Sequence, residues 1–170
     1  MSLPPFDRVV TEHGPVVLRV CRALLPAHDA EDAAADAFVA ALEAYPRLRP
    51  ASDIKAWLVT IAHRKALDIL RRRARQAVPV AELPEQPGTS EPALPDEPLW
   101  TAVRALPGKQ RQAVAYRYVA DLAYADVAGV MGISEAAARR NAADGIKALR
   151  HSYLPGSGAL LGSPPNQENR

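Results

Sequence analysis

The chain has 170 residues, enough for one domain or two small ones. Hydrophobic residues make up 48% but aromatic residues only 5%, so much of the apolar content is alanine, which favours an all-α fold over a sheet. The formal net charge of +2 indicates no class of partner by itself, and no apolar run approaches the ~20 residues needed to cross a bilayer, so we expect a cytoplasmic protein without membrane insertion.

Three helices are predicted in the first half of the chain. Pro15 suits a first helical position and predicts a helix through Leu25. Within it Cys21, the only cysteine, is expected to be a small core residue, since it has no partner for a disulfide or a thiolate metal cluster.

Asp29 is predicted to cap the second helix. Its apolar face recurs at three- and four-residue steps: Ala34, Ala37, Phe38, Ala41, Leu42 and Tyr45. Ser52 is predicted to cap a long third helix, whose apolar stripe begins with Ile54, Trp57, Leu58, Ile61 and Ala62.

A proline-rich acidic segment separates the two halves. Residues 79–98 hold six of the 16 prolines, five acids and no Lys or Arg, a composition that favours an extended, solvated tether. We therefore predict two small helical domains, 6–76 and 99–153, joined by a flexible linker over 77–98 and followed by a disordered tail over 154–170.

The second half begins with a short helix carrying Leu99, Trp100, Val103 and Leu106, followed by a helix over about 109–120. The last two helices have the features of a helix-turn-helix. Gly132 permits a tight turn, Ser134 caps the final helix, Ala128 is small where the helices cross, and Ile133 fills the core. An ordinary helical hairpin is the alternative, and the combination favours the DNA-binding motif.

Charge alternates along the chain. Residues 29–43 contain five acids and no cation, whereas residues 53–76 contain seven cations and two acids, a balance of +5. A basic helix end is typical of a phosphate-facing surface, although it also fits a solvated helix end favoured by its own dipole.

Two blocks of the sequence resemble the extracytoplasmic-function group of bacterial sigma factors in the sigma-70 family. DAEDAAADAFVAALEAYPRLRPASDIKAWLVTIAHRKALDILRRR resembles region 2, and LPGKQRQAVAYRYVADLAYADVAGVMGISEAAARRNAADGIKALR resembles region 4. The blocks stand in the family's order, on either side of a variable linker. The resemblance implies an alternative sigma factor that binds core RNA polymerase through the β′ clamp helices and the β flap and directs initiation at promoter DNA. It also implies an anti-sigma factor that would cover the same faces.

The resemblance assigns three surfaces. It implies docking on core polymerase by the acidic helix, through Asp29, Glu31, Asp32 and Asp36. It implies binding of the minus-10 element, with a flipped base, by Ser52, Lys55, Trp57, His63, Arg64, Arg71 and Arg72, with Arg73 in the same run. It implies binding of the minus-35 element in the major groove by Ser134, Glu135, Arg139, Arg140, Asn141 and Lys147.

The sequence departs from the family pattern at several of these surfaces. Ala35 and Ala40 stand where the family often has polar or basic residues, and Arg64 stands where it often has the asparagine of the flipped-base pocket. The last helix is rich in alanine, and of these Ala138 and Ala142 are expected to face inward, whereas Ala136, Ala137 and Ala143 face DNA.

Trp57 lies on the apolar stripe and is expected to be mainly core, whereas His63 lies on the opposite face and is expected to be exposed toward nucleic acid. No nucleophile, glycine-rich phosphate loop or metal-ligand spacing accompanies these residues, so we predict no catalysis, no cofactor and no metal. The alternatives are a helix-turn-helix regulator that acts without core polymerase, a helical adaptor for protein partners, and an inactive sigma-like protein.

Overall fold

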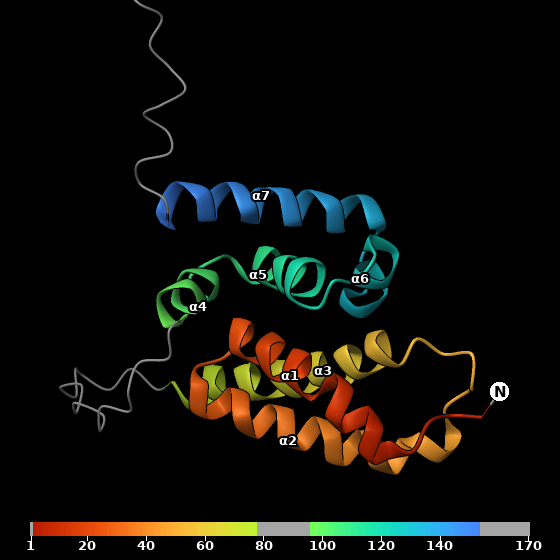
Figure 1. Ribbon diagram of the computed structural model, residues 1–170. Helices are drawn as coiled ribbons and strands as arrows, with labels where there is room; N and C mark the ends of the chain where they lie inside the picture. Colours follow the sequence, from red (N-terminus) through yellow and green to blue (C-terminus); the bar gives the residue numbers. More distant parts are fainter. Residues whose placement is uncertain (1, 78–95, 154–170) are drawn as a thin grey trace, which may run out of the picture.

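The computed structural model describes residues 2–77 and 96–153, and they form two stacked groups of helices with no strand among them (Figure 1). The all-α prediction is confirmed. The first group holds α1 (Phe6–Leu24), α2 (Ala27–Ala44), a 3-10 turn (Tyr45–Arg47) and α3 (Ile54–Gln76). Most of the predicted linker over 77–98 lies outside the described residues, as does the predicted tail over 154–170. At its end the prediction is wrong, because Glu97 and Pro98 belong to α4, so the second helical group begins two residues earlier than predicted. None of the described helices is long and apolar enough to cross a membrane.

α1 begins nine residues before the predicted start, so the prediction that Pro15 opens it is wrong. Pro15 lies inside the helix with its ring exposed. Val9 and Val17 are both buried on one face, and Phe6 makes an edge-to-face contact with Tyr45, with ring centroids 5.1 Å apart. Burial of this apolar face outweighs the backbone hydrogen bond that a proline inside a helix removes.

Two predicted caps are also wrong. α2 begins at Ala27 after Pro26, which places Asp29 within the first turn, where the helix dipole favours an acid. α3 is capped by Asp53, whose Oδ1 accepts a hydrogen bond from the Ala56 amide at 3.0 Å, and Ser52 precedes the cap. Adjacent Ser and Asp can both cap a helix, so spacing alone did not separate them.

The apolar face of α2 is narrower than predicted. Ala34, Ala37 and Ala41 are buried, and Phe38 is half-buried, but Leu42 is 56% exposed. Small alanines let α1 and α3 pack closely along this stripe, while Leu42 lies beyond its edge.

The second group holds α4 (Glu97–Arg104), α5 (Gly108–Val114) with a π-helical turn (Ala115–Val119), α6 (Tyr124–Met131) and α7 (Glu135–Tyr153). The helix-turn-helix features form as predicted. Gly132 is left-handed, with φ of 66°, and Ser134 Oγ accepts a hydrogen bond from the Ala137 amide at 3.1 Å. Ala138 and Ala142 are fully buried, which confirms that they face inward.

Gly145 allows α7 to approach α5. A Cβ at this position would stand 2.6 Å from Val114 Cγ2 and 3.3 Å from the Gln110 carbonyl oxygen. Because the Val114 methyl group would have to shift and the Gln110 carbonyl oxygen leaves little room beside it, Gly145→Ala is expected to lower the free energy of unfolding by about 1–3 kcal/mol in urea denaturation.

Gly129→Ala is the matched control for Gly145→Ala. Gly129 is an exposed position of α6, where an added Cβ meets nothing within 4 Å. The higher helix propensity of alanine predicts an unchanged stability or a gain of up to about 1 kcal/mol. Equal effects of the two substitutions would contradict close packing of α7 on α5.

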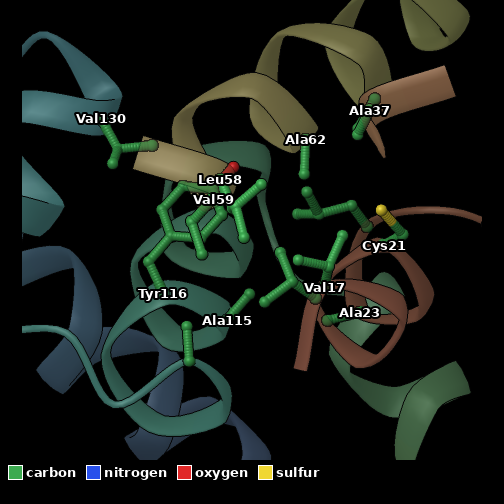
Figure 2. Close-up of a cluster of buried hydrophobic side chains, with 14 of the residues drawn as sticks. Val17, Cys21, Ala23, Ala37, Leu58, Val59, Ala62, Ala115, Tyr116 and Val130 are labelled. Atoms are coloured by element: carbon green, nitrogen blue, oxygen red, sulfur yellow. The ribbon is translucent and has the colours of Figure 1, made fainter. Parts of the chain in front are cut away.

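The two groups share an apolar core (Figure 2). Leu58, Val59 and Ala62 of α3 belong to the same buried cluster as Ala115 and Tyr116 of the π-helical turn, which packs against α1, and these residues are almost completely buried. The predicted two domains are therefore packed against each other in this structure.

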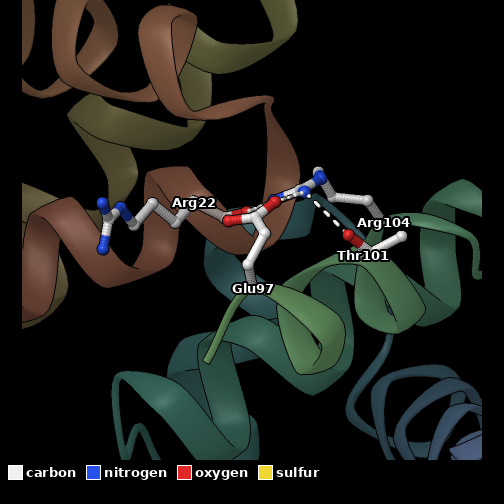
Figure 3. Close-up of polar contacts among 4 residues, drawn as sticks. All are labelled: Arg22, Glu97, Thr101 and Arg104. Carbon is white, nitrogen blue, oxygen red and sulfur yellow. Dashed lines mark hydrogen bonds and ion pairs between the residues drawn. The ribbon is translucent and has the colours of Figure 1, made fainter. Parts of the chain in front are cut away.

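Polar contacts at the end of α1 also join the groups. Arg104 Nη1 donates to the Arg22 carbonyl oxygen at 3.1 Å, and its Nη2 is paired with Glu97 and donates to Thr101 (Figure 3). Arg111 Nη1 donates to the Leu24 carbonyl oxygen at 3.5 Å. These arginines satisfy carbonyl groups that the end of a helix leaves without backbone partners.

Candidate nucleic-acid interface

α7 presents a polar surface on the side away from α5. Of the six predicted minus-35 residues, five are exposed and Asn141 is half-buried; the exposed residues are Ser134, Glu135, Arg139, Arg140 and Lys147. The Asn141 amide donates to the Ala137 carbonyl oxygen at 2.9 Å, so it lies along its own helix. Ala136 and Ala143 are exposed between these side chains, which leaves the helix backbone accessible.

The two arginines of α7 differ in their surroundings. Arg139 Nη2 lies 2.5 Å from Glu135 Oε1, one turn earlier, and its Cζ is 4.5 Å from the ring centroid of Tyr124 on α6. Arg140 has no ion pair or side-chain hydrogen bond within the described ranges. One guanidinium is thus held by neighbours, and the other extends from the helix.

The predicted minus-10 residues are distributed over more than one face of α3. Lys55 is half-buried, and its Nζ donates to the Asp121 carbonyl oxygen of the second group at 3.2 Å. Trp57 is half-buried, 6.1 Å from Tyr45 between ring centroids, which agrees with a mainly core role. Ser52 is half-buried in the loop, whereas Arg64, Arg71 and Arg72 are exposed.

The prediction that His63 is exposed is wrong. Its side chain is 7% exposed, and its Nδ1 forms a hydrogen bond with the hydroxyl of Tyr116 in the second group. Burial, together with the positive charges of Arg64 and Arg71, lowers the pKa of His63 from 6.5 to about 4. His63 is therefore a neutral residue of the contact between the two groups.

A groove of about 470 Å³ lies next to His63, between α3 and α6. Arg64, Leu67 and Arg71 line it from α3, and the segment 129–132 lines it from α6. Two of the predicted promoter-facing arginines thus line a groove between the two helical groups.

The acidic surface of α2 is divided. Glu31, Asp32 and Asp36 are exposed, as their predicted docking role requires. The Asp29 side chain is only 14% exposed and is ion-paired with Arg73 of α3, which contradicts its placement on the exposed surface. Because α2 packs against α3, the start of the acidic helix neutralises part of the basic helix end.

Three features of the surface escaped the sequence predictions. Val39 is 59% exposed and Leu42 is 56% exposed, so α2 carries apolar side chains beside its acids. Tyr124 contacts Arg139, and Tyr116 covers His63. Val39 lies outside the predicted apolar face of this helix, which was a readable signal for its exposure. Leu42 was predicted on that face, and its exposure, like the two tyrosine contacts, depends on tertiary packing.

Outside this surface, the part of the chain that the structure describes holds no cluster of reactive groups. Burial raises the pKa of Cys21 to about 12, in agreement with the predicted core role. Within residues 2–77 and 96–153, no cluster of three or more His, Cys, Asp or Glu residues is suitable for a metal ion.

Two family matches follow the two helical groups. Residues 9–76 match the family described as Sigma-70 region 2, and residues 96–149 match the family described as Sigma-70, region 4. The two matches stand in the order that the sequence resemblance predicted.

Relatives of the chain include named sigma factors. It is 27% identical over 163 residues to the ECF RNA polymerase sigma factor SigE of Mycolicibacterium smegmatis, covering 90% of this chain and 63% of that protein. It is 29% identical over 153 residues to the ferric citrate uptake sigma factor FecI of Escherichia coli, covering 85% of this chain and 86% of that protein. An uncharacterized protein of Rhizobium meliloti is 32% identical over 122 residues, 64% of this chain and 29% of that protein. The chain thus spans less than two thirds of two of these relatives.

Two solved structures have a similar fold. The sigma factor RpoE of Bartonella quintana, in complex with the anti-sigma factor NepR, has a TM-score of 0.75 at 22% identity, covering 89% of this chain and 98% of that chain. CnrH, in complex with the cytosolic domain of CnrY, has a TM-score of 0.67 at 22% identity, covering 89% of each chain.

Proposed function

Because the chain belongs to the extracytoplasmic-function group of the sigma-70 family, we propose that it is an alternative sigma factor that binds core RNA polymerase in the cytoplasm and directs initiation at a restricted set of promoters. The observation that carries the proposal is the helix-turn-helix, in which the left-handed Gly132 and the Ser134 cap set α7 outward from its support. A helix exposed in this way can enter the major groove.

Formation of a complex with core polymerase tests the proposal against a regulator that acts alone. A sigma factor is expected to co-elute with core enzyme in gel filtration at one copy of each. A helix-turn-helix regulator is expected to remain apart from core enzyme and to dimerise on palindromic duplex. Elution of the chain away from core, as a dimer on duplex DNA, would favour the regulator.

In the proposed complex, α7 reads the minus-35 element. Arg139→Ala and Arg140→Ala are each expected to weaken binding of a promoter fragment, because arginine can form two hydrogen bonds with guanine or one with phosphate. Loss of a bidentate guanine contact costs about 1–3 kcal/mol, measurable by fluorescence anisotropy with the labelled fragment.

The salt dependence of binding separates the two kinds of contact. A substitution that only reduces the slope of affinity against salt concentration removed a phosphate contact, whereas one that changes sequence preference removed a base contact. Unchanged affinity for both substitutions would contradict the role of α7. Lys109→Ala, on an exposed position of α5, is the control.

For the minus-10 element, the exposed Arg64, Arg71 and Arg72 are the best-supported contacts. His63 can meet DNA only after Tyr116 moves away from it. Ser52, Lys55 and Trp57 remain proposed contacts from the loop and the first turns of α3, beside this surface.

For core polymerase, we propose that Glu31, Asp32 and Asp36 dock together with the exposed Val39 and Leu42. The double substitution Asp32→Arg with Asp36→Arg is expected to weaken core binding by about tenfold or more, because it reverses two charges at a charged interface. Co-elution and competition for core enzyme measure this change. Asp7→Arg, an exposed acid on α1, is the matched control and is expected to bind normally.

An anti-sigma factor is a further proposed partner. The sigma factor RpoE and the protein CnrH share the fold of this chain, and each was solved with another protein, which for RpoE is the anti-sigma factor NepR. A partner of this kind would cover the same exposed faces of α2, α3 and α7 that the polymerase and the promoter require.

A further inference from the structure

Tyr124, the first residue of α6, lies beside two guanidinium groups. Its ring centroid is 4.5 Å from Cζ of Arg139 and 5.1 Å from Cζ of Arg117. α6 supports the helix-turn-helix and α7 is its recognition helix, so the ring connects the support to the surface proposed to read DNA. The negative face of an aromatic ring attracts a cation placed over it.

Arg117, in the π-helical turn that precedes α6, forms the other part of the Tyr124 surroundings. Its Nη1 donates to the Leu122 carbonyl oxygen at 3.1 Å and lies 3.5 Å from Oδ1 of Asp121. Asp121 adopts a left-handed conformation, with φ of 53°, at the break between the π-helical turn and α6. Tyr124 therefore contacts an arginine that is itself bound to the backbone of this turn.

Arg139 is held from two directions. Its guanidinium lies by the ring of Tyr124, and its Nη2 is bound to Glu135 at 2.5 Å. Arg140, the next residue, has no such pair of neighbours among the residues that the structure describes. The two side chains thus carry the same guanidinium group, but that of Arg139 is restrained by its neighbours and that of Arg140, among the described residues, is not.

We propose that Tyr124 is a positioning residue that holds the Arg139 guanidinium ready for DNA, and that Arg139 rather than Arg140 thereby specifies sequence. This inference rests on the proposed function of α7. A bidentate contact with guanine requires a planar fork at a fixed orientation, and a side chain that is already ordered loses less freedom on binding. The less restrained Arg140 binds a phosphate group, because a phosphate contact requires positive charge but no fixed orientation of the guanidinium plane.

The first test observes Arg139 in the full chain without DNA. The Nε–Hε resonance of Arg139 is expected to show a ring-current shift, which Tyr124→Leu removes and Tyr124→Phe preserves. Tyr153→Leu is the matched control, because Tyr153 is an exposed tyrosine of α7 that lies about four helical turns beyond Arg139. An Arg139 resonance that is unchanged in Tyr124→Leu would overturn the positioning role.

The second test uses holoenzyme bound to a promoter fragment. Tyr124→Leu is expected to weaken binding by about two- to fivefold, the size of an exposed cation–π contact, and Tyr124→Phe is expected to restore it. In an Arg139→Ala background Tyr124→Leu is expected to have no further effect. Equal losses in both backgrounds would show that Tyr124 only supports the fold.

Base preference completes the test. Arg139→Ala is expected to relax preference at one base pair, while Arg140→Ala reduces only the salt slope. The reverse assignment would overturn the inference. If no holoenzyme forms, the proposed function fails, whereas the resonance of Arg139 still decides whether Tyr124 holds it.

Discussion

Leu58→Ala is expected to lower the free energy of unfolding by about 2–5 kcal/mol, because it removes a large side chain from the core that the two helical groups share. The two tryptophans report on the groups separately, since Trp57 belongs to α3 and Trp100 to α4. In urea denaturation of Trp57→Phe and Trp100→Phe variants, Leu58→Ala is expected to move both fluorescence transitions together.

Leu42→Ala is the matched control for this substitution. Leu42 is 56% exposed on α2, and the same change there is expected to alter stability by no more than about 0.5 kcal/mol. If Leu58→Ala shifts the Trp57 transition and leaves that of Trp100 in place, the groups unfold independently and the shared core contributes nothing to the second group.

Acidification is expected to destabilise the fold through His63. The pKa of His63 is about 4 in the folded chain, below its ordinary value of 6.5, because of burial and the neighbouring charges of Arg64 and Arg71. Between these two values the unfolded chain binds the proton and the folded chain does not. The contribution of His63 to stability is therefore complete above pH 6.5 and falls by roughly 3 kcal/mol as pH approaches 4.

His63→Gln isolates this effect from the titration of carboxylates over the same range. The variant is expected to be less stable than the native chain at pH 7.5, because it loses the imidazole that bonds to Tyr116. Its free energy of unfolding is expected to fall less steeply between pH 6.5 and 4. Parallel profiles of the two proteins would mean that His63 is accessible to protons in the folded chain.

The helical content and the helix-turn-helix were predictable because they depend on local signals. Gly132 and Ser134 act within one turn of their own positions, and a buried alanine stripe follows from helical spacing. The start of α1 was not predictable in this way, because the contact of Phe6 with Tyr45 outweighs the local signal of Pro15.

The burial of His63 could not be predicted from the sequence of α3 alone. Helical periodicity divides one helix into an apolar face and an opposite face, but it does not reveal that a second group of helices covers the opposite face. Tyr116, more than 50 residues later, buries His63 and bonds to it. The pairing of Asp29 with Arg73 escaped prediction for the same reason, since it depends on how α2 packs against α3.

The charge pattern predicted the surfaces better than it predicted individual residues. Glu31, Asp32 and Asp36 are exposed on α2, and Arg64, Arg71 and Arg72 on α3. Their exposure is necessary for contact with a partner, and their roles in such contacts remain predictions.

Run-off transcription with purified core RNA polymerase and genomic fragments decides whether this chain is a sigma factor. Discrete start sites are expected to appear only when the chain is added, and the chain is expected to co-elute with core enzyme. The absence of discrete start sites, combined with the absence of co-elution, would contradict this function.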